Sequence, residues 1–295
     1  MKKKYGKSVL FLTAILWGTT FSIGKLATEA FSASFIIALR FSVASIVLLF
    51  ATYPLRNLLT KQYWIDGFKM GITLFLSYIL QVGALSMDTS PGKSAFLCTT
   101  YCVMVPFLYW FVTKQRPQWL HIACVLICML GIGVLSFHGS LGMSIGDFLT
   151  VLSGLPGAAN IVVSSIACRD KNPLLLTTIE LNIVAILAWC CVGATQTFPT
   201  NFPVETVGGI VYLGVVATAL CLFLQSYGLK YTDASIGGML LSLESVFGVV
   251  FSIILYHEKI TGRMVLGFVI IFIAIVLSQI EVKERKSLHK SSCKS

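Results

Sequence analysis

The sequence has 295 residues, of which 56% are hydrophobic and only 12% are charged, and its mean hydropathy is +0.86. These values lie outside the range of water-soluble globular domains. The formal net charge is +10, but Lys and Arg lie at the ends of apolar segments instead of forming one basic face, which argues against a nucleic-acid partner. The composition therefore predicts a membrane protein.

Ten apolar runs are long enough to cross a hydrocarbon core of about 30 Å. Together they use nearly every residue and leave no soluble domain. They predict an all-α integral membrane protein with ten transmembrane helices. The runs are 8–28, 33–53, 66–86, 93–113, 119–137, 146–167, 173–195, 207–228, 235–256 and 262–281.

The distribution of basic residues predicts the topology. If the N-terminus is cytoplasmic, the inner loops receive most of the Lys and Arg residues, and the outer loops receive only Lys93, Lys259 and Arg263. Such an excess on the inner side is typical of membrane proteins. We therefore expect a multi-pass protein of the plasma membrane, in bacteria the inner membrane, with both termini in the cytoplasm.

An internal repeat appears at an offset of about 144 residues, where QVGALSMDTSPGKSAF overlays QSYGLKYTDASIGGML. Each copy holds five helices, and an odd number inserts the second copy upside down relative to the first. The sequence thus predicts two inverted five-helix repeats, 1–140 and 141–282, followed by a basic cytoplasmic tail, 283–295. Inverted repeats are typical of secondary transporters.

Two segments resemble a known family: WGTTFSIGK in the first helix and LLSLESVFGVVFSIILYHEKITGRMVLGFVIIFIAIVLS near the end. The second contains L-x-x-E, a small residue, Val-Phe, and a further glutamate, represented by Glu244, Ser245 and Glu258. In this pattern the sequence resembles the EamA-type members of the drug/metabolite transporter superfamily over essentially its whole length. It departs at Ser245, where many members carry proline.

The resemblance implies two inverted five-helix repeats, a central cavity and alternating access. It also implies movement of small organic metabolites such as amino acids or drug-like amines, often outward, by proton antiport or by facilitation. It names no particular substrate. A non-transporting membrane sensor or accessory subunit is the alternative function.

Glu244 lies near the middle of an apolar stretch, where an ionisable side chain is costly. It could bind substrate, or take up a proton on one side of the membrane and release it on the other. It could equally form a structural hydrogen bond that holds the ninth helix.

Trp17, Thr20 and Phe21 share one face of the first helix by their three- and four-residue spacing. Trp17 is too deep for the interfacial belt in which tryptophan usually collects. An aromatic and hydroxyl face of this kind suits a cavity wall that holds an amine. Ordinary helix packing explains the same stripe.

Further binding candidates lie on other helices. Tyr78 and Gln81 share a face of the third helix, Tyr101 lies on the fourth, and Asn160 follows Gly154-Leu-Pro-Gly157 on the sixth. The glycines and proline predict a break in the sixth helix, and broken helices often mark transport sites. A simple kink is the alternative. The expected cavity is lined by helices one, three, four, six, eight and nine.

Four polar residues are predicted to serve gating or structure. Lys25 could reach the outer interface or bind an anionic group. Arg40 and Glu180 come from opposite faces of pseudo-equivalent helices, so we expect a separate partner for each. Gln225 is the counterpart of Gln81, with Gln81 expected near the outer mouth and Gln225 near the inner one.

The sequence predicts no catalytic residues, no cofactor and no metal site, because its cysteines lie in helices without supporting histidines. It is therefore not expected to be an enzyme. The expected partners are a small-molecule substrate, the lipid bilayer and, if transport is coupled, protons. The oligomeric state is expected to be a monomer or a homodimer.

Overall fold

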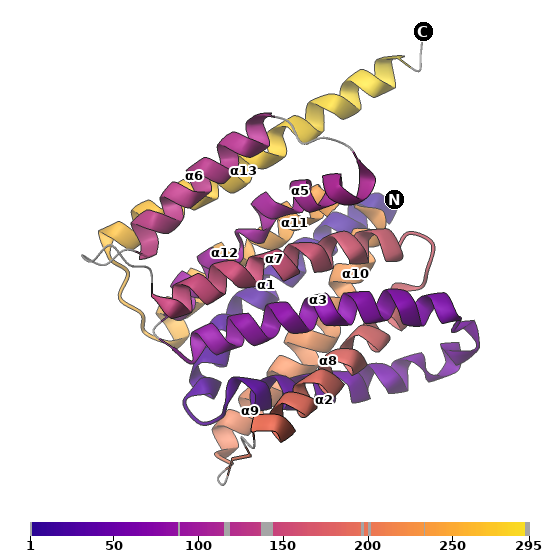
Figure 1. Ribbon diagram of the computed structural model, residues 1–295, viewed down its shortest axis with the longest axis vertical. Helices are drawn as coiled ribbons and strands as arrows, with labels where there is room; N and C mark the ends of the chain where they lie inside the picture. The colour runs from indigo at the N-terminus through magenta and orange to yellow at the C-terminus, as the bar shows by residue number, and fades with distance from the viewer. Residues whose placement is uncertain are drawn as a thin grey trace.

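The computed structural model describes residues 2–87, 89–114, 119–136, 144–195, 198–199, 202–232 and 234–292. Every regular element in these ranges is a helix (Figure 1). The predicted repeat boundary at 140–141 and the side chains of the predicted tail lie outside this description. The helices are α1 (Lys2–Thr28), α2 (Ala33–Thr52), the 3₁₀ helix η1 (Tyr53–Leu58), α3 (Lys61–Leu85), α4 (Pro91–Cys98), α5 (Tyr101–Thr113), α6 (Trp119–Ser136), α7 (Ile145–Ala167), α8 (Pro173–Thr195), α9 (Val204–Tyr212), the π-helix η2 (Leu213–Leu220), α10 (Cys221–Tyr231), α11 (Ala234–Ser242), α12 (Glu244–Leu255) and α13 (Gly262–Ser292).

Eight helical stretches in the described residues are long and apolar enough to cross a membrane. The predicted spans 119–137 and 262–281 correspond to two shorter apolar helices, Ile122–Val134 and Gly262–Leu277. The structure therefore has the all-helical, multi-pass character that the sequence predicts. The eight stretches are Tyr5–Thr28, Ala33–Leu58, Lys61–Leu85, Pro91–Thr113, Ile145–Ala167, Pro173–Thr195, Val204–Tyr231 and Ala234–Leu255.

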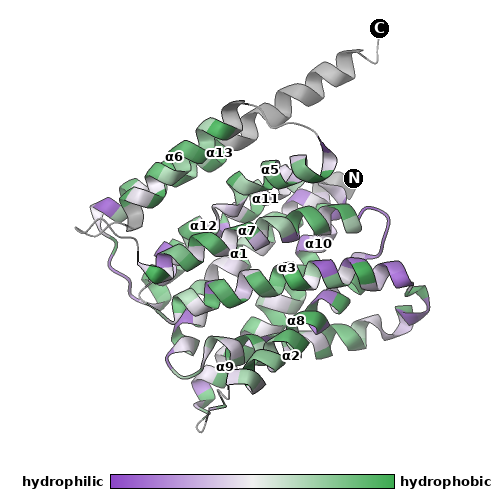
Figure 2. Ribbon diagram, viewed as in Figure 1, coloured by the Kyte–Doolittle hydropathy of each residue, from purple (hydrophilic) through white to green (hydrophobic). Residues whose placement is uncertain are grey.

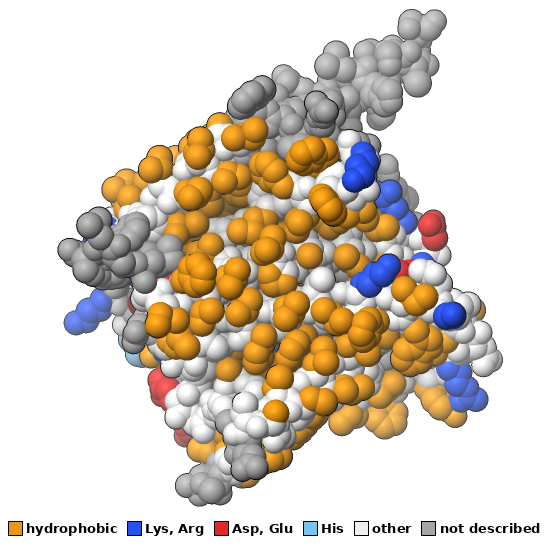
Figure 3. Space-filling model, in the orientation of Figure 1, with side chains coloured by type: hydrophobic (Ala, Val, Ile, Leu, Met, Phe, Trp, Pro, Cys, Tyr) orange, Lys and Arg blue, Asp and Glu red, His pale blue; other side chains and the backbone are white. Residues whose placement is uncertain are grey.

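The outer surface of the helices is hydrophobic. Figure 2 shows hydrophobic residues along the helices and hydrophilic residues mainly near their ends, and Figure 3 shows the same hydrophobic cover on one face. Phe50, Phe111 and Leu130 are 80%, 75% and 68% exposed. An apolar surface of this extent suits contact with lipid.

Two membrane stretches contain breaks that the sequence analysis missed, because it treated 93–113 and 235–256 as continuous helices. The first break lies between α4 and α5, where the hydroxyls of Thr99 and Thr100 donate to the carbonyls of Phe96 and Leu97 at 2.8 Å each. Such side-chain bonds to the preceding turn compete with the helical ladder. The break therefore arises without proline.

The second break lies at Leu243, between α11 and α12, at the equivalent place in the predicted repeat. Ser242 donates to the carbonyl of Met239 at 2.7 Å, and Ser245 donates to that of Ser242 at 2.8 Å. The same hydroxyl chemistry thus flanks both breaks.

The predicted break in the sixth membrane helix is wrong. The corresponding helix, α7, runs from Ile145 to Ala167 with Pro156 inside it. The hydroxyl of Ser77 on α3 donates to the carbonyl of Ser153 at 3.0 Å, so a neighbouring helix supplies polar contact near the proline. The helix accommodates this proline without ending.

The predicted span 207–228 contains a π-helical segment, η2. The Thr218 hydroxyl donates to the carbonyl of Leu213, five residues back, at 2.7 Å. π-Helical turns loosen the backbone ladder and occur often at functional sites.

The helices define two ends of the molecule. We call the end where α4 and α7 begin and α12 ends the Asp147 side, and the opposite end, where α3 and α8 begin, the Asp66 side. In Figure 1, α1 begins and α13 ends toward the same edge, the Asp66 side. In Figure 3, most of the visible Lys and Arg side chains gather at that edge.

Candidate functional site

A cavity lies where the broken helices meet. Its volume is about 70 Å³. It is lined from α1, α3, α4, α5, α7, α10 and α12, which are the helices of the first, third, fourth, sixth, eighth and ninth predicted spans. The lining residues are Trp17, Thr20, Phe21, Leu74, Ser77, Tyr78, Gln81, Cys98, Tyr101, Ser153, Gly157, Asn160, Ile161, Gln225 and Glu244.

The structure brings all eight sequence-predicted binding residues to this one cavity, together with Gln225. Sequence reasoning missed six other lining residues. Ser153, Gly157 and Ile161 share a face of α7 with Asn160 by their spacing, so extending that face along the helix would have found them. Cys98 lies one turn before Tyr101, Leu74 lies one turn before Tyr78, and Ser77 lies one turn before Gln81. The missed residues are Leu74, Ser77, Cys98, Ser153, Gly157 and Ile161.

Glu244 is the acidic residue of the cavity and is only 5% exposed. Its Oε1 accepts a hydrogen bond from the Tyr101 hydroxyl at 3.1 Å and from the Cys98 thiol at 3.8 Å. It occupies the first turn of α12, where unpaired backbone N–H groups favour a negative charge. The break at Leu243 thus places a carboxyl at a helix N-terminus in the middle of the protein.

Asn160 links the cavity to a second buried acid, Glu180 on α8. Asn160 Nδ2 donates to Glu180 Oε1 at 2.7 Å and to the carbonyl of Met70 at 3.1 Å. Asn160 Oδ1 accepts from Gln225 Nε2 at 3.2 Å. The other oxygen of Glu180 has no hydrogen-bond partner in the described residues, and Glu180 does not line the cavity. Glu180 therefore lies outside the cavity lining and holds the Asn160 side chain in position through this hydrogen bond.

Arg40 on α2 also lies outside the cavity lining, and it is 4% exposed. It donates to the hydroxyl of Thr218 and to the hydroxyl of Tyr78, the latter at 3.3 Å, and its guanidinium carbon lies 4.9 Å from the Tyr78 ring centre. The carbonyl of Ala217 in η2 accepts from Arg40 at 3.4 Å and from Trp17 Nε1 at 2.8 Å. Arg40 and Glu180 have the separate partners that the sequence predicts, and Arg40 fixes Tyr78.

The structure gives the positions of four further polar residues, and one of them, Lys93, differs from its predicted position. Lys25 donates to the carbonyls of Leu85 at 2.6 Å and Met87 at 2.9 Å, so it caps the end of α3. Lys93 is not a loop residue, because it lies in α4 and is 7% exposed. Gln81 and Gln225 both line the cavity.

The chemistry of the cavity follows from its lining. A carboxyl, four aromatic side chains, and several hydroxyl and amide groups suit an organic cation or an amine that also accepts hydrogen bonds. A volume of about 70 Å³ holds a few waters, whereas drug-sized ligands occupy roughly 300–1,000 Å³. The cavity described is therefore too small for a drug-sized ligand and would have to widen to hold one.

A broken-helix membrane fold around a small polar cavity defines a class of protein, the polytopic membrane transporters. The model of the EamA-like transporter family matches twice, over residues 4–137 and 144–279. The chain belongs to the EamA-like transporter family, and it is a membrane transporter and not an enzyme.

Relatives support this class. An uncharacterized transporter of Archaeoglobus fulgidus is 30% identical over 96% of this chain and 88% of its own length. Biotin transporters of Salmonella typhimurium and Escherichia coli are each 23% identical over 88% of this chain and 90% of their own length. One crystal structure aligns with a TM-score of 0.68 at 17% identity, covering 94% of this chain and 98% of that one, and so shares the fold.

Proposed function

We propose that this protein is a secondary transporter that exports small organic metabolites, such as amino acids or drug-like amines, by alternating access. The observation that carries the proposal is the cavity, where a buried carboxyl, Glu244, lies among aromatic, hydroxyl and amide side chains from seven helices. Glu244 would bind the substrate cation or a proton, and this exchange would couple the two movements.

The proposed architecture is ten transmembrane helices in two inverted repeats, 1–140 and 141–282. The two matches to the family model and the two hydroxyl-flanked helix breaks, one in each half, support it. The basic side chains gathered on the Asp66 side support a cytoplasmic location for that side, for both termini and for the tail 283–295. The proposed location is the plasma membrane.

The small cavity fits an alternating-access cycle. A substrate larger than a few waters needs a wider cavity than the one described, so the helices must separate to hold it. Rocking of the two repeats about the central cavity would then open each side in turn.

Ligand-induced thermal stabilisation of the purified protein tests the substrate class, because a ligand that binds the folded state raises its melting temperature. The panel contains amino acids, quaternary amines, nucleobases, sugars and biotin, at mildly acidic and mildly alkaline pH. Biotin belongs in it because two relatives are named biotin transporters. An amine or amino acid is expected to stabilise the wild type but not the Glu244→Gln variant. Equal stabilisation of both proteins by every active compound would contradict the role of Glu244.

A further inference from the structure

Two short helices, α4 from the first half and α12 from the second, run from the cavity toward the Asp147 side. Contacts link the end of each helix to the beginning of the other. Cys98 at the end of α4 contacts Glu244 at the start of α12, whereas Gly92 at the start of α4 contacts Glu258, just beyond the end of α12. The two helices are therefore antiparallel neighbours, with Glu244 at one end of the pair and Glu258 at the other.

The middle of this pair is tightly packed. A Cβ atom placed on Gly248 of α12 would lie 2.4 Å from the Cβ of Ala95 on α4, which is closer than side chains approach. Backbone contact of this kind between small residues is typical of closely packed membrane helices. It leaves no passage between α4 and α12 in this conformation.

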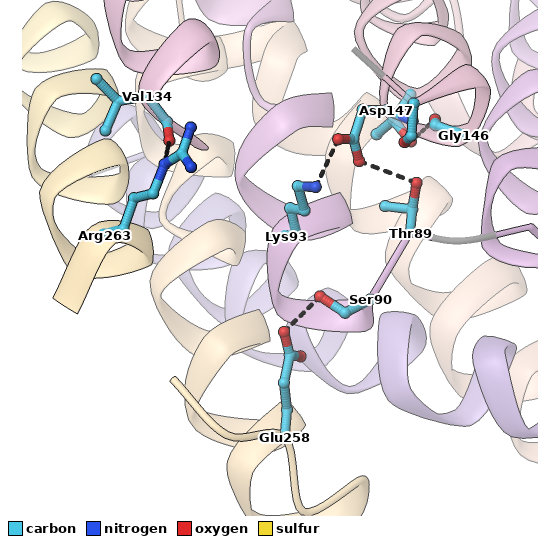
Figure 4. Close-up of polar contacts among 10 residues, drawn as sticks. Thr89, Ser90, Lys93, Val134, Gly146, Asp147, Glu258 and Arg263 are labelled. Atoms are coloured by element: carbon cyan, nitrogen blue, oxygen red, sulfur yellow. Dashed lines mark hydrogen bonds and ion pairs between the residues drawn. The ribbon is translucent and has the colours of Figure 1, made fainter. Parts of the chain in front are cut away.

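Glu258 fixes the beginning of α4. Its carboxylate accepts a hydrogen bond from the Ser90 hydroxyl (Figure 4). It also accepts from the backbone N–H of Gly92 at 2.8 Å and from the Ser252 hydroxyl. A helix N-terminus has unpaired N–H groups and favours a negative charge. A carboxylate from the second half of the chain thus caps a helix from the first half.

Lys93 ties the same helix to α7. Its Nζ lies 2.5 Å from Asp147 Oδ2, and the side chains of Lys93 and Asp147 are 9% and 0% exposed (Figure 4). The other oxygen of Asp147 accepts from the Thr89 hydroxyl at 3.1 Å. A buried ion pair persists only while both charges stay together, because either charge alone would lack compensation.

The Asp66 side has a corresponding ion pair that is more exposed. Lys171 Nζ lies 2.6 Å from Asp66 Oδ2, and these side chains are 21% and 13% exposed. Among the described residues, each end of the molecule thus has one ion pair between a residue before 115 and a residue after 143. Because the two ion pairs lie at opposite ends, rocking of the two halves would pull apart one pair at a time, first at one end and then at the other.

We propose that Lys93, Asp147 and Glu258 form the gate that closes the cavity on the Asp147 side, and that these contacts break when substrate passes on that side. The inference rests on the alternating access proposed above. The short helix α4, roughly 12 Å long at helical rise, connects the gate to the Glu244 site, because Lys93 lies near one end and Cys98 at the other. Binding at Glu244 can therefore shift the gate through α4.

The native thiol of Cys98 reports on this gate, since it lines the cavity and is 5% exposed. The assay measures the rate at which a charged, membrane-impermeant methanethiosulfonate modifies Cys98, in intact cells and in inside-out vesicles. The surface thiols Cys190 and Cys191 and the tail thiol Cys293 are replaced by serine in every protein compared. A Cys98→Ser variant of this background identifies the labelled site.

The gate variant is the double substitution Lys93→Met and Asp147→Asn, which removes both charges and leaves no unpaired ion. Modification from the exterior is expected to rise at least about ten-fold, equal to about 1.4 kcal/mol in the opening equilibrium. The matched control, Lys171→Met with Asp66→Asn, is expected to accelerate modification in inside-out vesicles only. Glu258→Gln, which leaves Lys93 and Asp147 paired, is expected to act like the gate variant and serves if the double variant does not fold.

An exterior rate unchanged from the parent in a correctly folded gate variant or Glu258→Gln would overturn the proposal. An equal exterior increase in the Asp66–Lys171 control would overturn it as well, because the effect would then be general loosening. The assay uses no substrate. Expected labelling without substrate flux would support the gate and contradict the proposed transport function. Substrate flux without the expected labelling would contradict the gate alone.

Discussion

At the scale of single residues, the carboxyl of Glu244 is the group on which the account depends. Its contacts with Tyr101 and Cys98 hold it at the cavity wall, but neither partner carries a positive charge. A buried carboxyl with only neutral partners exchanges readily between proton and cation, because either one removes the cost of the buried charge.

Replacing Glu244 with glutamine keeps the volume and removes the exchangeable charge. Because hydrogen bonds to charged groups contribute about 1.5–3 kcal/mol, we expect proton-driven flux of the stabilising compound to fall by roughly 10- to 100-fold. The same substitution at the other buried acid, Glu180→Gln, should retain the pH dependence, since Glu180 does not line the cavity. An unchanged pH profile in a normally expressed Glu244→Gln variant would refute the coupling role.

Asn160 provides a separate prediction, about stability. Asn160→Ala removes the donor to Glu180 Oε1 and leaves that carboxyl without a described hydrogen-bond partner, so unfolding in detergent should become easier by about 1.5–3 kcal/mol. In combination with Glu180→Gln the loss should be smaller than the sum of the single losses by about 1 kcal/mol, because the two residues interact. Strictly additive melting-temperature changes would show that the contact contributes nothing.

At the scale of elements, the helix breaks show which features of the helices the sequence predicts and which it does not. Glycine and proline predicted a break in α7, where the helix continues. Thr99, Thr100 and Ser242 gave no such signal, yet their hydroxyls bond the preceding turns where the helices break. Serine and threonine also occur in unbroken membrane helices, so their effect depends on the surrounding packing, which periodicity does not describe.

The packing of α12 against α4 is testable through Gly248. Gly248→Ala places a Cβ within 2.4 Å of Ala95, so the two helices must separate, and we expect a loss of about 1–3 kcal/mol. Gly83→Ala in α3 is the matched control, because its Cβ would meet nothing within 4 Å. That change should be neutral or stabilising by about 0.5–1 kcal/mol, since alanine favours a helix. Equal melting temperatures for the two variants would contradict the close packing.

At the scale of the whole molecule, the sequence predicted the membrane class, the family and the residues that meet at the cavity, because hydropathy and helical spacing determine which faces point inward. It could not predict which polar residues pair across the two halves. Lys93 looked like a loop charge, and its burial against Asp147 depends on contacts 54 residues apart in sequence. Such contacts follow from the assembled fold and not from local pattern.

The central claim is that the protein by itself moves a small metabolite across the bilayer. The most direct test is uptake of the radiolabelled compound that stabilises the protein most, by purified protein in sealed liposomes with no partner present. The account predicts saturable, protein-dependent uptake that an opposing proton gradient accelerates. Binding of the compound without any protein-dependent uptake would contradict the account and would favour a sensor or accessory subunit.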